Sequence, residues 1–520
     1  MFPSSISSSL TLTMTMTTTT ICSLVLVLVF LCYATLPFFT LLYRQSRSPL
    51  LKLRGPPSRS FFMGNLEEMH DAENIVPPHS TTLFQEWEKE YGKVFVYQGF
   101  VGGKRLMLMD PRTVGEVLGR AYDYPKPEFV RDSLSGMVGG FQKGAEGLLT
   151  SEGAVHRRQR KILSPAFTSS HIKSLTPIFW EKATQLRDIW LSIAEQTSHT
   201  NPSTPTPLSK AEWEPKNEHG LRIDALSWLA RATLDIIGEA GFGHHFKSLE
   251  GPGEDALAEA FSVIFSTARK FRVMTILQVW FPILRGLRRN NQTMIQARAT
   301  MRRIGLDLIR ERQAQAAATS SEKKRDACCE EVAVEMRGRD LLSVLIRANE
   351  REKAAADGRL TEGMNEEEML CQISTFLAAG HETTSSALTW CLYALAKDPG
   401  SQQKLRNALL SVESDSLSGQ QRYDAIEKCQ YLDWVVRETL RMHAPVTSTM
   451  RVCMVDGGDE LPVARLVILS LTRYALNEVA FDSPYYDKDG VLQQTIKLNK
   501  YDIISIPIQA INREGDGEWR

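Results

Sequence analysis

The sequence predicts a mainly helical domain with a small β portion, preceded by one N-terminal transmembrane helix. Three observations lead to this prediction. Helical periodicity dominates from about residue 112 to residue 443, where a charged loop is predicted at residues 318–339. Short β-rich runs flank that region, at residues 94–109 and near residues 503–508. The first 43 residues carry no charge and include a long apolar run.

The N-terminal segment has the composition of a membrane anchor. A Ser/Thr-rich lead at residues 1–20, expected in the lumen, precedes an apolar run at residues 21–43. As a helix this run would span roughly 34 Å, enough to cross a hydrocarbon core of about 30 Å. Arg44 and Arg47 follow at once, and positive charge on this flank places the rest of the chain in the cytosol. The alternative is a cleaved signal peptide, but a basic region before the apolar run is missing.

A hinge separates this segment from the folded part. Residues 44–60 are basic and proline-rich, and the sequence RGPP at 54–57 is stiff and non-helical. We expect one large domain over residues 61–520. It begins with a predicted helix at residues 80–92, where apolar side chains recur at helical spacing.

Composition excludes some classes of protein. Lys+Arg and Asp+Glu both number 61, so nothing indicates a polyanionic partner such as nucleic acid. The eight cysteines are scattered, without the spacing of a disulfide framework or a zinc site. A reducing compartment agrees with this pattern.

One predicted helix, residues 360–397, is far longer than the usual helix of about 11 residues. Its centre is nearly uncharged and contains the sequence AGHETTS at 379–385. Glycine there costs about 1 kcal/mol relative to alanine, so we expect something to press against the backbone. The neighbouring acid and alcohol, Glu382 and Thr383, are suited to relay protons. The alternative is a small-residue packing notch with a solvated Glu382.

A second predicted helix, residues 431–442, contains Glu438 and Arg441. Positions three apart share one face of a helix, so these two side chains are expected to pair. Apolar neighbours on the same helix predict that the pair is partly buried. Removal of one partner would then strand a charge, at a cost of roughly 3–5 kcal/mol when burial is complete.

Together, the two helices resemble those of the cytochrome P-450 family, and the closest likeness is to fungal microsomal enzymes. The resemblance implies that Ala379 and Gly380 lie against a haem. It implies that Glu382 and Thr383 deliver protons to iron-bound dioxygen. The family has an E-x-x-R pair that stabilises the fold near the haem, and Glu438 with Arg441 matches it.

Two further segments resemble parts of this family that hold the haem propionates. In one segment of the family, an arginine that contacts a haem propionate follows a similar sequence, and Arg451 follows Pro445-Val446 in the same way. The sequence GAVHRRQR at 153–160 is similar to the family's W-x-x-x-R helix, with His156 at the tryptophan position and Arg160 at the arginine. A histidine still donates a hydrogen bond to a carboxylate. The alternatives are that Arg160 is solvated within a basic run and that Arg451 pairs elsewhere.

The chain departs from the family pattern in two places. The family's iron ligand is a cysteine in a loop of the form F-x-x-G-x-x-x-C-x-G, and no cysteine here lies in such a loop. Cys453, the last one, has strand-like surroundings. The predicted fold therefore lacks the cysteine loop, the metal ligand and the last helix. An apolar stretch at residues 466–481 also has no counterpart, which suggests retained intron sequence or a mis-spliced gene.

The resemblance implies a haem-dependent monooxygenase that inserts one oxygen atom from dioxygen into an apolar organic substrate. Electrons would come from NADPH through a membrane-bound reductase. The expected location is the endoplasmic reticulum membrane, with a single span and a cytosolic catalytic domain. The alternative is a non-catalytic truncated remnant without the iron-ligating cysteine. A purely structural membrane protein is disfavoured, because such a role has no use for an acid–alcohol pair.

Overall fold

The computed structural model falls into two compact units, each built from separate stretches of the chain. Unit 1 contains residues 1–124, 269–291 and 451–505, and unit 2 contains residues 125–268, 292–450 and 506–520. The residues that the structure describes are 25, 32, 36, 39–40, 42–69, 83–138, 146–199, 222–251, 256–269, 292–322, 340–355, 363–412, 419–463 and 485–513.

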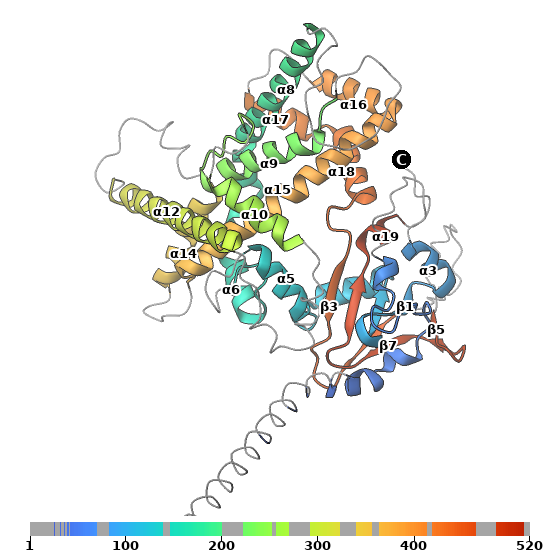
Figure 1. The fold of residues 1–520 in the computed structure, drawn as a ribbon. Helices are drawn as coiled ribbons and strands as arrows, with labels where there is room; N and C mark the ends of the chain where they lie inside the picture. Colours follow the sequence, from blue (N-terminus) through green and yellow to red (C-terminus); the bar gives the residue numbers. More distant parts are fainter. Residues whose placement is uncertain are drawn as a thin grey trace, which may run out of the picture. The chain divides into compact units, whose positions relative to one another are not determined.

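Unit 1 is built on a four-stranded sheet, of which β1 and β3 are labelled in Figure 1. The strand order is β1-β2-β8-β3. β1 and β2 form an antiparallel hairpin, and β8 pairs with β2 in parallel, with Arg105 opposite Ile503. Two smaller sheets pair β4 with β7 and β5 with β6. The elements are η1 Pro49–Lys52, α3 Leu83–Tyr91, β1 Val94–Gln98, η2 Phe100–Gly102, β2 Lys104–Leu108, α4 Pro111–Gly119, β3 Thr449–Val452, β4 Asp459–Pro462, β5 Tyr485–Tyr486, β6 Leu492–Gln493, β7 Thr495–Leu498 and β8 Ile503–Ile506.

The hairpin of unit 1 is buried on both faces. Phe95, Tyr97 and Leu106 are fully buried, so side chains of both alternating sets lie in the core. The Tyr97 hydroxyl lies 2.7 Å from the Ser505 hydroxyl of β8. This side-chain bond and the parallel ladder join the start of the folded part to its last strand.

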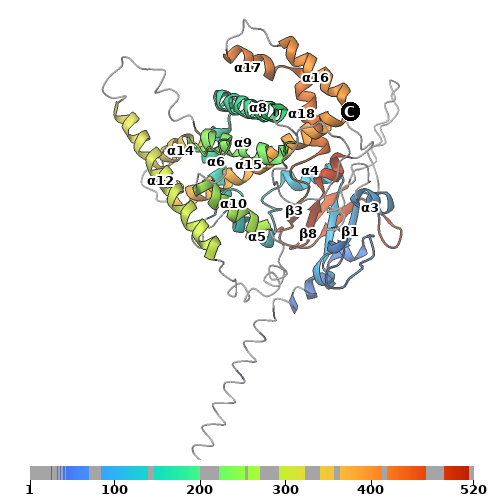
Figure 2. The same cartoon turned by 45° about the horizontal axis from the view of Figure 1, so that its top comes forward.

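Unit 2 is helical. Its longest helix, α15, packs against α9 and α18 (Figures 1 and 2). The elements are α5 Glu128–Val138, α6 Gly153–Leu163, η3 Ser164–Phe167, α7 Ser169–Ser174, α8 Thr176–His199, α9 Ala225–Phe242, α10 Ala256–Arg269, α12 Gln292–Glu322, α14 Leu341–Ala355, α15 Glu366–Lys397, α16 Pro399–Val412, α17 Gly419–Glu427, α18 Gln430–Met442 and α19 Ile508–Asn512.

The start of α15 is fixed by a capping box. The Asn365 side chain accepts a hydrogen bond from the Glu368 N–H at 2.8 Å, and the Glu368 carboxylate accepts one from the Asn365 N–H at 3.0 Å. Every residue from 368 to 378 is buried. This half of α15 therefore forms the centre of the main hydrophobic core, which also contains residues of α9, α12 and α14.

The predicted fold class, mainly helical with a small β portion, is confirmed. The long helix ends at Lys397 as predicted, and the predicted helix at 431–442 is α18. Two details were wrong. Ile508 was placed in a β run but begins α19, because Pro507 has no N–H to continue the ladder. Residues 318–322, predicted as loop, belong to α12.

The predicted membrane anchor at residues 21–43 lies almost entirely outside the described residues, and so does the apolar stretch at 466–481. Within the described ranges, no helix combines the length and the apolar character that a membrane crossing needs.

Candidate functional site

The second half of α15 is exposed on two different sides. Ala379 is exposed, and Glu382 and Thr383 lie one turn further along on the same side. Thr384, Leu388 and Leu392 follow one another at intervals of four residues on the opposite side, where Leu388 is 41% and Leu392 42% exposed. Residues 368–378, upstream of Ala379, are all buried. The small exposed side chain of Ala379 leaves room for an apolar ligand beside Glu382 and Thr383.

Gly380 faces another side of α15. A Cβ at this position would lie 2.9 Å from Cδ1 of Ile237 in α9. The group that presses on the helix backbone at this glycine is therefore a protein side chain. A role of Gly380 in cofactor binding stays a prediction.

Glu382 and Thr383 are half-buried and lie on the same side of α15 as Ala379. The Thr383 hydroxyl donates to the Ala379 carbonyl, one turn earlier, at 2.5 Å. Such back-bonding keeps the hydroxyl at the helix surface, where its oxygen lone pairs can accept a further hydrogen bond. On the α9 side of the helix, Thr233 donates to the His381 carbonyl at 3.1 Å. α15 remains helical from end to end.

α6 presents a cationic face that contains two of the three predicted propionate ligands, His156 and Arg160. His156 is half-buried and Arg160, one turn later, is exposed. Burial lowers the pKa of His156; Glu152 opposes this change, while Lys126 and Arg160 add to it. Two cations and one acid thus act on His156. An incoming carboxylate would be favoured here, and neutral His156 would still donate to it.

A buried polar network joins α6 to α15, and sequence reasoning missed it. Gln159 and Gln372 are fully buried and bond to each other at 3.0 Å. Gln159 also donates to the Glu146 carbonyl at 2.8 Å, and Gln372 accepts from the Leu148 N–H at 3.0 Å. The network fixes the cationic helix against the long helix. Glutamines inside otherwise helical patterns were the available signal, but their burial cannot be read from one sequence.

Glu438 and Arg441 form a two-pronged ion pair on α18. The N–H groups of Arg441 donate to the two carboxylate oxygens at 2.7 and 2.6 Å. A third N–H donates to the Asn512 carbonyl of α19 at 2.8 Å. The bonds to Glu438 raise the pKa of Arg441. Arg441 therefore links α18 to α19, in addition to its pairing with Glu438 within α18.

Arg451 and Cys453 belong to unit 1. Arg451 is half-buried in β3, and Cys453 follows that strand and is fully buried. Backbone bonds join Cys453 to Asp502 and Tyr501 at 3.0 and 2.7 Å. Burial raises the pKa of the Cys453 thiol, so it stays protonated and is unsuited to bind a metal as thiolate.

The donors of unit 2 fit part of a haem. The cationic face of α6 matches two carboxylates, and the small exposed side chain of Ala379 on α15 leaves room for an apolar face. Among the described cysteines, 32, 371, 391, 429 and 453, none lies in a glycine-rich loop. No cluster of three or more His, Cys, Asp or Glu suited to a metal occurs in the described part of the chain. The fit is thus to the propionates and one face, without an axial ligand.

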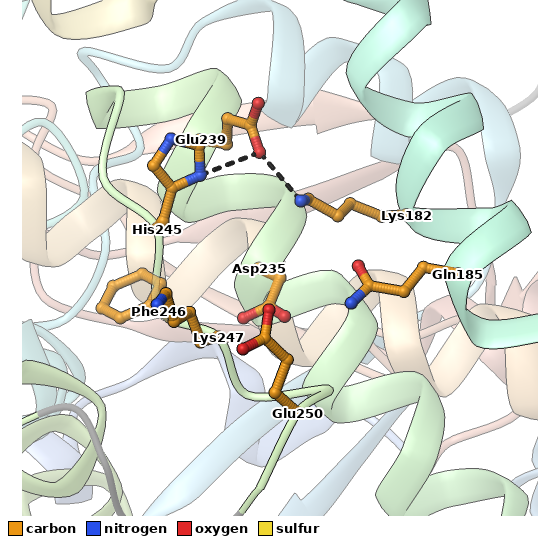
Figure 3. Close-up of a pocket in the computed structure, with 8 residues that line it drawn as sticks. All are labelled: Lys182, Gln185, Asp235, Glu239, His245, Phe246, Lys247 and Glu250. Carbon is orange, nitrogen blue, oxygen red and sulfur yellow. Dashed lines mark ion pairs between the residues drawn. The ribbon is translucent and has the colours of Figure 1, made fainter. Parts of the chain in front are cut away.

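A separate small pocket, of about 80 Å³, lies between α8, α9 and the segment after α9 (Figure 3). The carboxylate of Glu239 lies 3.1 Å from Nζ of Lys182 and 3.3 Å from Nδ1 of His245. Burial alone would lower the pKa of Lys182, but hydrogen bonds to Glu181 and Glu239 raise it. These charges satisfy one another, and no predicted site residue lines the pocket.

Comparison with known proteins gives one coherent result. The family model described as "Cytochrome P450" matches residues 54–485. The chain is 36% identical to cytochrome P450 monooxygenase 205 of Postia placenta over 487 residues, which is 93% of this chain and 77% of that protein. It is 35% identical to cytochrome P450 monooxygenase 128 of the same fungus, with the same coverage. Identity to cytochrome P450 monooxygenase claU of Ampulloclitocybe clavipes is 29%, again over 93% and 77%.

Proposed function

The chain belongs to the cytochrome P450 family of haem-dependent monooxygenases, and we propose that it inserts one oxygen atom from dioxygen into an apolar organic substrate. The observation that carries this proposal is the side of α15 on which Ala379 is exposed, with Glu382 and Thr383 one turn further along. The other interpretation, a non-catalytic remnant, has no support in the comparisons.

Haem is the cofactor of this family, and when bound it supplies the activation of dioxygen. We propose that His156 and Arg160 of unit 2 hold its propionates by charge-assisted hydrogen bonds. A role of Arg451, which belongs to unit 1, stays a prediction from the resemblance. Ala379 offers a side chain small enough for a flat ring to approach the helix. Glu438 and Arg441 keep α18 in place and touch no reacting atom.

Thr383 and Glu382 are proposed to handle protons. The Thr383 hydroxyl donates a hydrogen bond to the Ala379 carbonyl, so its lone pairs are available to accept. Rotation would turn the O–H away from the helix, where it would pass its proton to an acceptor in the site. Glu382 in its protonated form, half-buried next to it, would then replace that proton on Oγ1.

We propose that NADPH supplies electrons through a membrane-bound reductase and that the endoplasmic reticulum membrane is the location. The apolar run at 21–43 and the cations that follow it support a single span with the catalytic domain in the cytosol.

A haem titration of the purified chain tests the proposal. We expect one haem to bind, with a Soret band that saturates, and Arg160→Ala to weaken the affinity about ten-fold because one charge-assisted bond is lost. Arg157→Ala, an exposed neighbour outside the predicted ligand set, serves as the control. Equal affinities for these two variants would contradict the assignment of α6, and no saturable binding would contradict the function.

A further inference from the structure

α5 carries an arginine whose charge is not paired. The Arg131 side chain is half-buried, and its Nε is shielded from solvent without a hydrogen-bond partner. The two acids of the same helix, Glu128 and Asp132, are exposed. In the part of the chain that the structure describes, no ion pair or hydrogen bond joins the Arg131 guanidinium to another residue. Because a guanidinium is always charged, a half-buried cation is left there without a counter-ion from the protein.

Two other arginines with a buried Nε bind the protein through their terminal nitrogens. Arg158 pairs with Glu368 and also donates to the carbonyl oxygen of residue 363 at 3.3 Å. Arg312 donates to two carbonyl oxygens at the end of α9, both at 3.1 Å. Arg422, on α17, is half-buried and, like Arg131, has no such bond to a described residue. A buried donor without a partner costs stability, so the positions of Arg131 and Arg422 decide which of them serves a ligand.

Arg131 lies on the packed side of α5. Its neighbours at helical spacing, Val130 and Leu134, are half-buried as well. Glu128 and Asp132 lie on the other side of the helix and are exposed. Among the described elements, α15 is the main packing partner of α5. The side of α5 that contains Arg131 is therefore the side that packs toward the long helix of the candidate site.

The start of α5 lies beside the cationic face of α6. The Lys126 N–H donates to the Glu152 carboxylate at 3.2 Å. Lys126 is also close enough to His156 to lower its pKa, although burial has the larger effect. Arg131 follows the first residue of α5 by roughly 5 Å along the helix. Arg131 therefore lies, within unit 2, on a helix that begins at the face proposed to hold the haem and packs against α15.

We propose that Arg131 binds a carboxylate of the substrate, so that the substrate is an apolar organic acid. This inference rests on the proposed monooxygenase function and specifies its substrate class. A planar guanidinium binds a carboxylate through two parallel hydrogen bonds, and one cation balances one monoanion. The half-buried Val130 and Leu134 beside it favour an apolar chain next to that carboxylate. Arg131 thus determines specificity and touches no reacting atom.

Calorimetric titration of the full chain, with and without haem, tests the proposal. The probes are decanoate and the neutral decanamide, whose flexible chains adapt to a site of any shape. At about pH 7 the acid is ionised, and we expect the parent chain to bind it more tightly than the amide. Arg131→Gln should weaken decanoate binding about ten-fold and change decanamide binding less than about two-fold, because only the acid loses a charged hydrogen bond. Arg131→Lys keeps the charge but not the planar fork, so its affinity for decanoate should lie between the two.

Arg422→Gln is the matched control. Arg422 is also half-buried with a buried, unbonded Nε, but it lies on α17, which packs against α16 and α18. This variant should bind both probes as the parent chain does. Because no described acid loses a partner in either variant, both should fold, with thermal unfolding midpoints like that of the parent chain. Haem propionates are the other carboxylates that Arg131 would suit, so haem affinity is measured too; we expect Arg131→Gln to change it less than about two-fold.

The outcomes separate this proposal from the proposed function. Saturable haem binding, with equal decanoate affinities in Arg131→Gln and Arg422→Gln, would overturn the substrate class and leave the monooxygenase proposal standing. A parent chain that binds decanoate no better than decanamide would overturn it as well. Weaker haem binding in Arg131→Gln with unchanged decanoate affinity would assign Arg131 to a propionate instead. A selective loss of decanoate affinity in a chain that binds no haem would support the carboxylate site and contradict the function.

Discussion

Arg441 and Arg437 lie about one turn apart on α18, and each pairs with a carboxylate of the same helix. The side chains of Arg441 and Glu438 are 31% and 15% exposed, and Arg441 also bonds to the α19 backbone. The side chains of Arg437 and Asp433 are 76% and 50% exposed, although their N···O distance is also short, 2.7 Å. Solvent therefore screens one pair far more than the other.

We predict that Arg441→Met lowers the free energy of unfolding by about 2–3 kcal/mol, below the loss for a fully buried pair because some solvent reaches this one. Arg437→Met should cost less than about 1 kcal/mol. The midpoint of urea unfolding, recorded by circular dichroism for both variants, measures the difference. Equal losses would show that the bonds of Arg441 to Glu438 and α19 contribute nothing beyond a surface pair.

His443, the residue after α18, is stacked on Trp390 of α15, with centroids 4.3 Å apart and an interplanar angle of 4°. Arg513 lies 3.3 Å from its Nδ1. Burial, and after it the charge of Arg513, lowers the pKa of His443 from 6.5 to about 4. The folded protein therefore keeps this ring neutral.

This difference predicts a pH dependence of stability. Between about pH 6.5 and about pH 4 the unfolded chain binds a proton that the folded chain does not, so stability is full above this window and falls through it. His443→Phe should remove about 1–2 kcal/mol of that loss, allowing for the partial exposure of the ring. Urea unfolding at about pH 7 and at about pH 4 measures this loss of stability. His245→Gln, a substitution of an exposed histidine, serves as the control. An unchanged acid loss in His443→Phe would contradict the assignment.

At the scale of elements, two helix glycines face neighbours of different kinds. A Cβ at Gly380 would meet Cδ1 of Ile237, the end of a flexible side chain, at 2.9 Å. A Cβ at Gly238 would meet the Phe246 ring at 2.3 Å and the His244 carbonyl oxygen at 2.7 Å. Side-chain ends move readily, while the backbone after α9 does not.

We therefore predict that the same substitution changes the stability of the protein differently at the two positions. Gly238→Ala should destabilise the protein by roughly 1–3 kcal/mol, because overpacking outweighs a propensity gain of about 1 kcal/mol. Gly380→Ala should be within about 0.5 kcal/mol of neutral, since Ile237 can rotate away and the same propensity gain applies. The midpoint of thermal unfolding, measured for both variants, tests this prediction. A large loss of stability in Gly380→Ala, with none in Gly238→Ala, would contradict it.

Elements with strong periodicity were predictable from the sequence, and their surroundings were not. The end of α15 follows from Asp398-Pro399, and the ion pair of α18 follows from the spacing of Glu438 and Arg441. The sequence predicted that something presses against the backbone at Gly380, but it did not identify Ile237 as the neighbour there. Which side chain lies across a helix crossing depends on tertiary packing, which periodicity does not encode.

At the scale of the whole molecule, unit 1 depends on strands that are far apart in the chain. The Tyr97 hydroxyl, on a fully buried side chain, bonds to Ser505 of β8 at 2.7 Å. The sequence predicted strands at both places but gave no information on their pairing. Pairing across such a separation depends on the rest of the fold.

Tyr97→Phe should destabilise unit 1 by about 1–2 kcal/mol, because it leaves the buried Ser505 hydroxyl without this partner. Amide exchange, followed by mass spectrometry, should quicken in β1, β2 and β8 and remain unchanged in α15. Equal acceleration in α15 would show that the two units open together.

The parallel pairing of β2 with β8 has a consequence for synthesis. A ribosome that has just added Leu108 must still add every residue up to Ile503 before β8 is available to pair with β2. At ordinary translation rates this takes about 20 to 80 seconds. During that interval the edge of the nascent hairpin, with Leu106 and Met107, is open to pairing with other chains. Chaperone protection of this nascent edge is therefore expected to decide how much of the chain reaches the native state.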